Sequence, residues 1–171
     1  MSEIKKVILG TGSYDNVLSG NTLSVTGDGG NAWEYYGSSY KKLAPLLVTY
    51  TPYAEKYQEL LKLKQDTSKI KEYLEYRYMI EEEYIKSYYE TRLKNLDVKE
   101  LLNTLYSKFG SNIILLCYEN IKEFCHRRLI ADYIEIKTGI YIPEVSVDDN
   151  GNIIKELPIR YKKRLLKQIN K

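Results

Sequence analysis

The sequence predicts a three-layer α/β fold around a mostly parallel sheet, with a helical insertion over 52–109 and a C-terminal hairpin and basic helix over 148–171. A length of 171 residues fits one domain, spanning 1–171. Short apolar runs alternate with helical patterns, which is typical of parallel strands joined by right-handed crossovers. The hydrophobic share of 43% and charged share of 29% exclude a disordered or collagen-like chain.

Two runs are the clearest strands. Ile4–Leu9 is short and β-branched, and it leads into a Gly/Ser/Thr-rich segment, Gly10–Asp15, that we expect to be a loop. Asn112–Cys117 is continuously apolar, as expected in the middle of a sheet covered on both faces. Weaker strands are expected at Thr22–Thr26 and Ile140–Val147.

The pattern over 52–109 is economically explained by three helices. Asp97 and Glu100 form the capping-box pattern at the start of the third. We interpret the tyrosine stripes on these helices as packing surface rather than ligand contacts. A further helix is expected to begin near Phe124 and to end at Gly139.

The C-terminal segment is predicted to turn at Asp149–Asn152 and then to form a basic helix with Pro158 in its first turn. Residues 160–171 carry six basic side chains and no acidic one, whereas the whole chain has a net charge of +3. We expect a solvated amphipathic helix here. A contact with RNA, a membrane or an acidic partner is the alternative.

The chain contains 18 tyrosines but only two phenylalanines, a bias that AT-rich codons produce. This composition favours a low-GC bacterium or one of its phages as the source. Two cysteines do not make a disulfide framework. Since no apolar run approaches the roughly 20 residues of a membrane span and no signal peptide is evident, we expect a cytoplasmic protein, in the host cytoplasm if phage-encoded.

The predicted sheet is Rossmann- or flavodoxin-like, and such sheets bind ligands beyond the carboxyl ends of their strands. If the strands at 4–9 and 112–117 are neighbours, the segments that follow them meet at this edge. Cys125, His126, Arg127 and Arg128 would then occupy the first turn of a helix, where free N–H groups favour an anion. The planar guanidinium group of arginine suits a phosphate, so phosphate binding is the simplest function for this helix start.

Catalysis or metal binding is an alternative to phosphate binding at this helix start. The helix start would depress the pKa of Cys125, making it a nucleophile with His126 or Glu119 moving protons, although a buried cysteine more often packs. Glu119 is the carboxylate expected to contact a ribose hydroxyl or an amine. Cys117, Cys125 and His126 offer three zinc donors but lack paired spacing and an evident fourth ligand, so we predict no metal and no cofactor.

Catalytic residues are not assigned, and the candidates are Glu119, Cys125 and His126. Aromatic side chains near the strand ends are expected to stack on a ligand. The predicted ligand-binding residues are Gly10, Thr11, Gly12, Ser13, Trp33, Tyr40, Cys117, Tyr118, Glu119, Cys125, His126 and Arg127.

The segment LLCYENIKEFCHRRLIADYIEIKTGIYIPEV, residues 115–145, resembles the signature of the DUF488 family: a strand ending in Leu-Cys-x-Glu, then Cys-His-Arg-x-Leu at a helix start. Matching positions are Leu116, Cys117, Glu119, Cys125, His126, Arg127, Leu129 and Ala131. Weaker likeness at Tyr40–Pro45 and Glu82–Leu102 extends the resemblance to roughly residues 4–147.

This resemblance implies a compact three-layer α/β fold and little about reaction. One departure is that many members carry Asp-x-Arg after the second strand, where this chain has Thr26-Gly27-Asp28-Gly29. The missing arginine removes a second cation, and the glycines would enlarge the pocket.

We expect a binding module for a small phosphorylated nucleotide-like ligand, for example an ADP-ribose-type immune signal sequestered by a phage protein. The alternative is a hydrolase or transferase that acts on a nucleotide or glycosidic bond through Glu119 or Cys125. A nucleic-acid or protein adaptor that uses the basic tail is a third class. No membrane partner and no nucleic acid are expected, and a homo-oligomer is left open.

Overall fold

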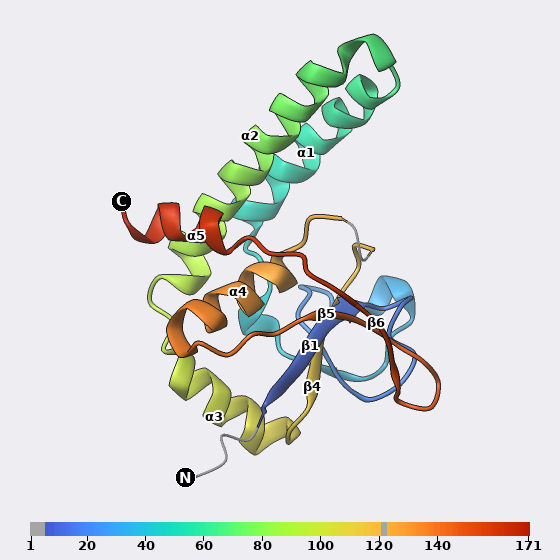
Figure 1. Ribbon diagram of the computed structural model, residues 1–171, viewed down its shortest axis with the longest axis vertical. Helices are drawn as coiled ribbons and strands as arrows, with labels where there is room; N and C mark the ends of the chain where they lie inside the picture. Colours follow the sequence, from blue (N-terminus) through green and yellow to red (C-terminus); the bar gives the residue numbers. More distant parts are fainter. Residues whose placement is uncertain (1–5, 121–122) are drawn as a thin grey trace.

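The computed structural model describes residues 6–120 and 123–171 and shows a mixed α/β fold (Figure 1). Its sheet has the order β3-β2-β4-β1-β5-β6. The strands are β1 (Ile8–Ser13), β2 (Asn21–Ser24), β3 (Ser38–Ser39), β4 (Ile113–Cys117), β5 (Glu144–Val147) and β6 (Ile153–Leu157). The helices are α1 (Leu47–Lys64), α2 (Ile70–Tyr88), α3 (Val98–Phe109), α4 (His126–Thr138) and α5 (Lys162–Ile169).

The sheet is parallel except at one edge, where β6 pairs antiparallel with β5 as the predicted hairpin. β4 lies between β1 and β2 and pairs parallel with both. All five residues of β4 are buried, as the continuous apolar run predicted. The expected pairing of the first strand with the central one is therefore confirmed, and the predicted fold class with it.

The first strand lies later in the chain than predicted. Positions 4 and 5 fall outside the described residues, and the glycine-rich segment is strand rather than loop: β1 includes Gly10, Thr11, Gly12 and Ser13. A Cβ on Gly12 would lie 2.4 Å from Cγ2 of Val17 and 2.9 Å from the carbonyl oxygen of Val145. Glycine is therefore required here because β5 and the chain after β1 approach closely, not because the backbone turns.

The helices predicted over 52–109 are three, as expected, and α1 and α2 form an antiparallel hairpin that projects from the body (Figure 1). α1 begins at Leu47, five residues before the predicted start at Pro52, and the helix continues through that proline. The Lys56 ammonium bonds the Glu83 carboxylate at 2.5 Å across the hairpin. Asp97 is confirmed as the N-cap of α3, where its carboxylate accepts the backbone N–H of Glu100, one of the two bonds of the predicted capping box.

Helices cover one face of the sheet and loops cover the other, which gives three layers. The helix-facing cluster joins β2 and β4 side chains such as Leu23 and Leu115 to residues of α2, α3 and α4. The opposite cluster packs Ile114 and Leu116 against Tyr14 and other loop residues. Among the described residues, no helix is long and apolar enough to cross a membrane.

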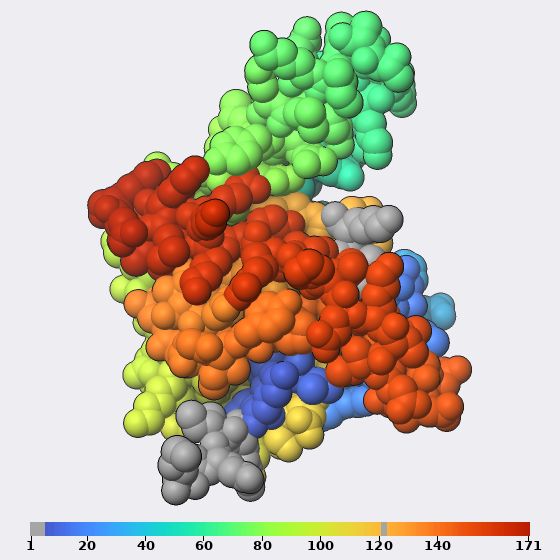
Figure 2. Space-filling model, viewed as in Figure 1, coloured from blue at the N-terminus to red at the C-terminus, as the bar shows by residue number. Residues whose placement is uncertain are grey.

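The C-terminal helix is amphipathic, as predicted, but it is packed rather than solvated. Figure 2 shows the C-terminal segment lying over α4 and against the base of the hairpin. α5 buries Leu165 completely, and Arg164 donates to Glu81 and Glu82 on α2. The helix begins only at Lys162, so Pro158 lies before it and not in its first turn.

Candidate functional site

A cavity of about 430 Å³ lies at the carboxyl ends of β2 and β4, beneath the base of the helical hairpin. The cavity receives residues from the segments after both strands, from α1 and α2, and from the start of α4. Its lining residues are Thr26, Gly27, Asp28, Pro45, Leu47, Tyr50, Tyr53, Tyr84, Cys117, Tyr118, Glu119, Phe124, Cys125 and His126. Its place at the carboxyl edge of parallel strands is where such sheets bind ligands.

Aromatic rings form one wall of this cavity. The ring centroids of Tyr53 and Tyr84 are 5.2 Å apart, and those of Tyr84 and Phe124 are also 5.2 Å apart. Tyr53 and Phe124 close the triangle at 5.7 Å. Because the three rings support one another, the wall is a preformed apolar surface with fixed ring orientations.

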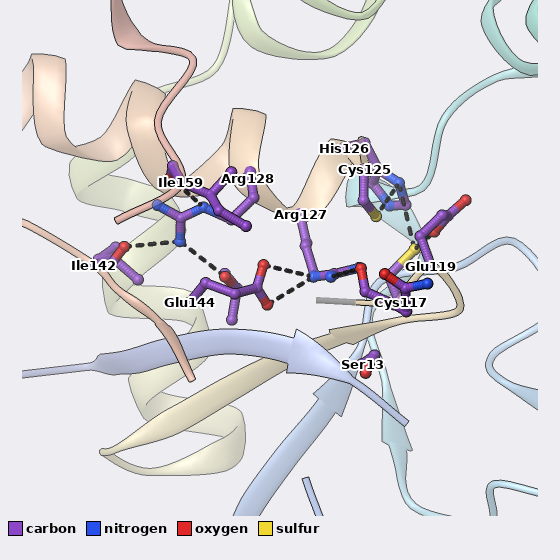
Figure 3. Close-up of polar contacts among 12 residues, drawn as sticks. Ser13, Cys117, Glu119, Cys125, His126, Arg127, Arg128, Ile142, Glu144 and Ile159 are labelled. Carbon is purple, nitrogen blue, oxygen red and sulfur yellow. Dashed lines mark hydrogen bonds and ion pairs between the residues drawn. The ribbon is translucent and has the colours of Figure 1, made fainter. Parts of the chain in front are cut away.

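A polar cluster forms one corner of the cavity (Figure 3). The thiol of Cys117 donates to Oε2 of Glu119 at 2.8 Å. Nδ1 of His126 lies 3.7 Å from the sulfur of Cys117 and 3.7 Å from that of Cys125. Both cysteines are free thiols, and the two cysteines and the histidine are buried.

Burial controls the protonation of Glu119 and Cys125 in this polar corner. It raises the pKa of Glu119 to about 7 and the pKa of Cys125 to about 12. The sequence-based expectation of a depressed cysteine pKa at the start of α4 is therefore wrong. The helix terminus and Arg127 favour a thiolate, but the loss of solvent around Cys125 outweighs them.

Asp28 and Tyr118 line the cavity and connect the segments that follow β2 and β4. The Tyr118 hydroxyl donates to a carboxylate oxygen of Asp28, and the backbone N–H of Ala32 donates to the hydroxyl at 3.0 Å. The backbone N–H of Gly30 also donates to Asp28 at 2.9 Å. Loss of solvent acts to raise the pKa of Asp28, but hydrogen bonds from Tyr118, Thr26 and the backbone of Gly30 and Ala32 hold it at about 2, so the carboxylate is charged at neutral pH.

Arg127 does not line the cavity. Its side chain is 0% exposed, and its Nε–H donates to both carboxylate oxygens of Glu144 in β5, at 3.0 and 3.1 Å. One Nη2–H reaches the carbonyl oxygen of Asn120 at 3.1 Å. The signal in the sequence was Glu144 itself, because an acidic residue within an apolar strand needs a buried cation.

Arg128 also points inward, on the other side of Glu144 (Figure 3). Its guanidinium donates to Oγ1 of Thr11 and the carbonyl oxygens of Ile142 and Ile159, and it pairs with Asp132 one turn later. Both arginines therefore hold α4 on the sheet. The sequence-based prediction placed both arginines at an anion-binding helix start and assigned Arg127 to the ligand, whereas both point into the fold.

The structure gathers five of the predicted site residues around the cavity: Cys117, Tyr118, Glu119, Cys125 and His126. The strand glycines with Thr11 and Ser13 do not line it, nor do Trp33, Tyr40 and Arg127. Trp33 is 53% exposed in a short 3-10 turn, and Tyr40 packs edge-on against Phe109 of α3. The predicted contact between the segments after β1 and β4 is confirmed, because the backbone N–H of Tyr14 donates to the carbonyl oxygen of Cys117.

Sequence reasoning missed the aromatic wall. Tyr53 and Tyr84 belong to the tyrosine stripes interpreted as packing, and both do pack, yet they also line the cavity. A stripe alone cannot tell which of its rings faces an empty space. Phe124, one of only two phenylalanines and placed just before Cys125, was the available signal.

A mostly parallel sheet with a cavity at its carboxyl edge defines an α/β domain whose cavity lies where such sheets bind ligands. The chain belongs to DUF488, a domain of unknown function, whose family model matches residues 49–134. The match runs from α1 to α4 and therefore includes the hairpin, the central strand and the cysteine-histidine corner. Searches of curated proteins and of solved structures found no match.

Proposed function

We propose that this cavity binds a small nucleotide-like molecule, with a flat base against the aromatic wall. The observation that carries the proposal is the ring triangle of Tyr53, Tyr84 and Phe124 within a cavity of about 430 Å³. Ligand cavities of ~300–1,000 Å³ are typical of small-molecule sites. Stacking of a base on an aromatic ring is worth ~1–3 kcal/mol.

In this proposal, two carboxylates accept hydrogen bonds from the sugar or amine part of the ligand. Glu119 and Asp28 both line the cavity and lie at its polar side. Carboxylates accept hydrogen bonds from ribose hydroxyls or exocyclic amines. They also repel phosphate. Since none of the Lys and Arg side chains in 6–120 and 123–171 lines the cavity, the proposal puts the phosphates at its open side.

Calorimetric titration with adenosine, AMP and ADP-ribose tests this function. We expect binding of at least one, with the phosphorylated ligands no more than ~10-fold tighter than adenosine, about 1.4 kcal/mol. Tyr53→Ala should weaken binding by ~10-fold or more through lost stacking. Tyr36→Ala is the matched control, because Tyr36 is 87% exposed and away from the cavity. Failure of all three ligands to bind would reject the proposal.

The proposal extends to sequestration: a phage protein of this kind would hold an ADP-ribose-type signal and so lower its free concentration. The position of the cavity at the carboxyl edge of the sheet and its aromatic wall support this extension. To distinguish a sequestering protein from an enzyme, the protein is incubated with the ligand that it binds and then denatured, and the released molecule is identified by mass spectrometry. Recovery of intact ligand supports sequestration, whereas cleaved ligand supports a hydrolase or transferase that uses Glu119 or Cys125.

A further inference from the structure

Three donor atoms converge at the polar corner of the cavity. The sulfurs of Cys117 and Cys125 and Nδ1 of His126 all lie within 4.8 Å of one another. They come from separate elements, since Cys117 ends β4 whereas Cys125 and His126 begin α4. Figure 3 shows the three side chains pointing toward one another.

Their spacing matches a tetrahedral zinc site. With Zn–S bonds of about 2.3 Å and Zn–N bonds of about 2.0–2.1 Å, the sulfur–nitrogen edge of a tetrahedron is about 3.6 Å. Both observed sulfur–nitrogen distances are 3.7 Å. Two edges of the donor triangle therefore already have the length that a tetrahedral zinc ion requires, and the sulfur–sulfur edge is at most 4.8 Å.

The tautomer of His126 is the one that a metal ligand needs. Nε2 lies 2.7 Å from the carbonyl oxygen of Val25, which can only accept a hydrogen bond, so Nε2 carries the proton. In the neutral imidazole, Nδ1 then presents its lone pair to the two sulfurs. A backbone carbonyl that accepts the other ring N–H is the usual support for a histidine ligand, because it fixes both tautomer and ring orientation.

The charges also balance. One Zn²⁺ with two thiolates is neutral, and the neighbouring buried pair of Arg127 and Glu144 is neutral as well. Zinc prefers sulfur and imidazole ligands, whereas magnesium and calcium prefer oxygen.

We propose that Cys117, Cys125 and His126 bind a Zn²⁺ ion whose fourth position faces the cavity. Glu119 is within reach of that position, because its carboxylate already contacts the Cys117 sulfur at 2.8 Å. Three protein ligands and one open position are the arrangement of zinc sites that act on a ligand. The three donors show no paired spacing in the sequence because the fold, rather than a short loop, brings them together.

The test uses the full chain, purified under reducing conditions without a chelator or a polyhistidine tag. Metal content is measured by inductively coupled plasma mass spectrometry. The protein is then stripped and titrated with Co²⁺, which absorbs strongly when thiolates bind it. Cys117→Ser, Cys125→Ser and His126→Gln are compared with Tyr50→Phe, a control that lines the same cavity without offering a donor.

We expect one zinc per chain and a thiolate-to-cobalt absorption band that saturates at one equivalent and disappears when Zn²⁺ is added. Each donor variant should bind Co²⁺ at least about tenfold more weakly, and Tyr50→Phe should match the wild type. The proposal would be overturned if the wild-type protein shows no thiolate-to-cobalt band, or if a Cys117–Cys125 disulfide persists in the presence of a reducing agent. These readouts need no nucleotide, so they stand or fall separately from the proposed function.

Discussion

Arg127 and Glu144 form a fully buried ion pair that ties the start of α4 to β5. The Nε–H of Arg127 lies 3.0 and 3.1 Å from the two carboxylate oxygens, and both side chains are 0% exposed. Taking two charges out of water is costly, so this pair is tolerated only because each partner compensates the other. The family-signature arginine therefore has a structural role in this chain.

Arg127→Ala should destabilise the protein by about 3–5 kcal/mol, because it leaves the Glu144 carboxylate buried without a partner. Replacing both members, Arg127→Met with Glu144→Leu, should recover most of that loss. Urea denaturation followed by circular dichroism measures both. Equal stability of Arg127→Ala and the wild type would show that Glu144 is compensated in another way.

Asp28 should make stability depend on pH in the acid range. Its pKa is lowered from 3.8 to about 2 in the folded protein. A lowered pKa means that the stabilisation is present above pH 3.8 and is lost as the pH falls through about 2. Tyr118→Phe removes one hydrogen bond to this carboxylate and should raise its pKa toward 3.8.

Carboxyl chemical shifts in an NMR pH titration report that pKa directly. The variant should also lose less stability than the wild type between about pH 4 and pH 2. Tyr36→Phe serves as the control, because Tyr36 is exposed. An Asp28 pKa that is the same in Tyr118→Phe and the wild type would contradict the assigned hydrogen bond.

Gly12→Ala should destabilise the sheet by about 1–3 kcal/mol, the typical cost of overpacking. Its Cβ would meet Val17 at 2.4 Å and the Val145 carbonyl at 2.9 Å. Gly27→Ala is the matched control, since a Cβ there meets nothing within 4 Å. Thermal unfolding of both variants checks the difference, and a stable Gly12→Ala would refute the close-approach explanation.

Leu165→Ala in α5 should destabilise the protein by about 2–5 kcal/mol, because Leu165 is fully buried in the main core. Lys163→Ala, on the exposed side of the same helix, should change stability by less than about 0.5 kcal/mol. Urea denaturation compares the two. Similar values for both would mean that α5 is a loosely attached tail.

Hydrophobic periodicity predicted the parallel sheet, the three insertion helices and the packed central strand, because those patterns record burial directly. It misplaced β1, since glycines typical of a loop occur there for close strand packing around Gly12. It also assigned Arg127 to the ligand, because a helix start looks the same whether its arginine faces an anion or Glu144. Long-range partners of this kind depend on the fold and not on local spacing.

The central claim is that the cavity beneath the hairpin is where a nucleotide-like ligand binds. Photo-cross-linking with an azidoadenine analogue of ADP-ribose, followed by peptide mass mapping, tests it most directly. The account predicts labels on the cavity residues Tyr53, Tyr84 or Phe124 that excess unmodified ADP-ribose or AMP prevents. Labels confined to the basic helix Lys162–Ile169, or no labelling that either nucleotide competes away, would contradict it.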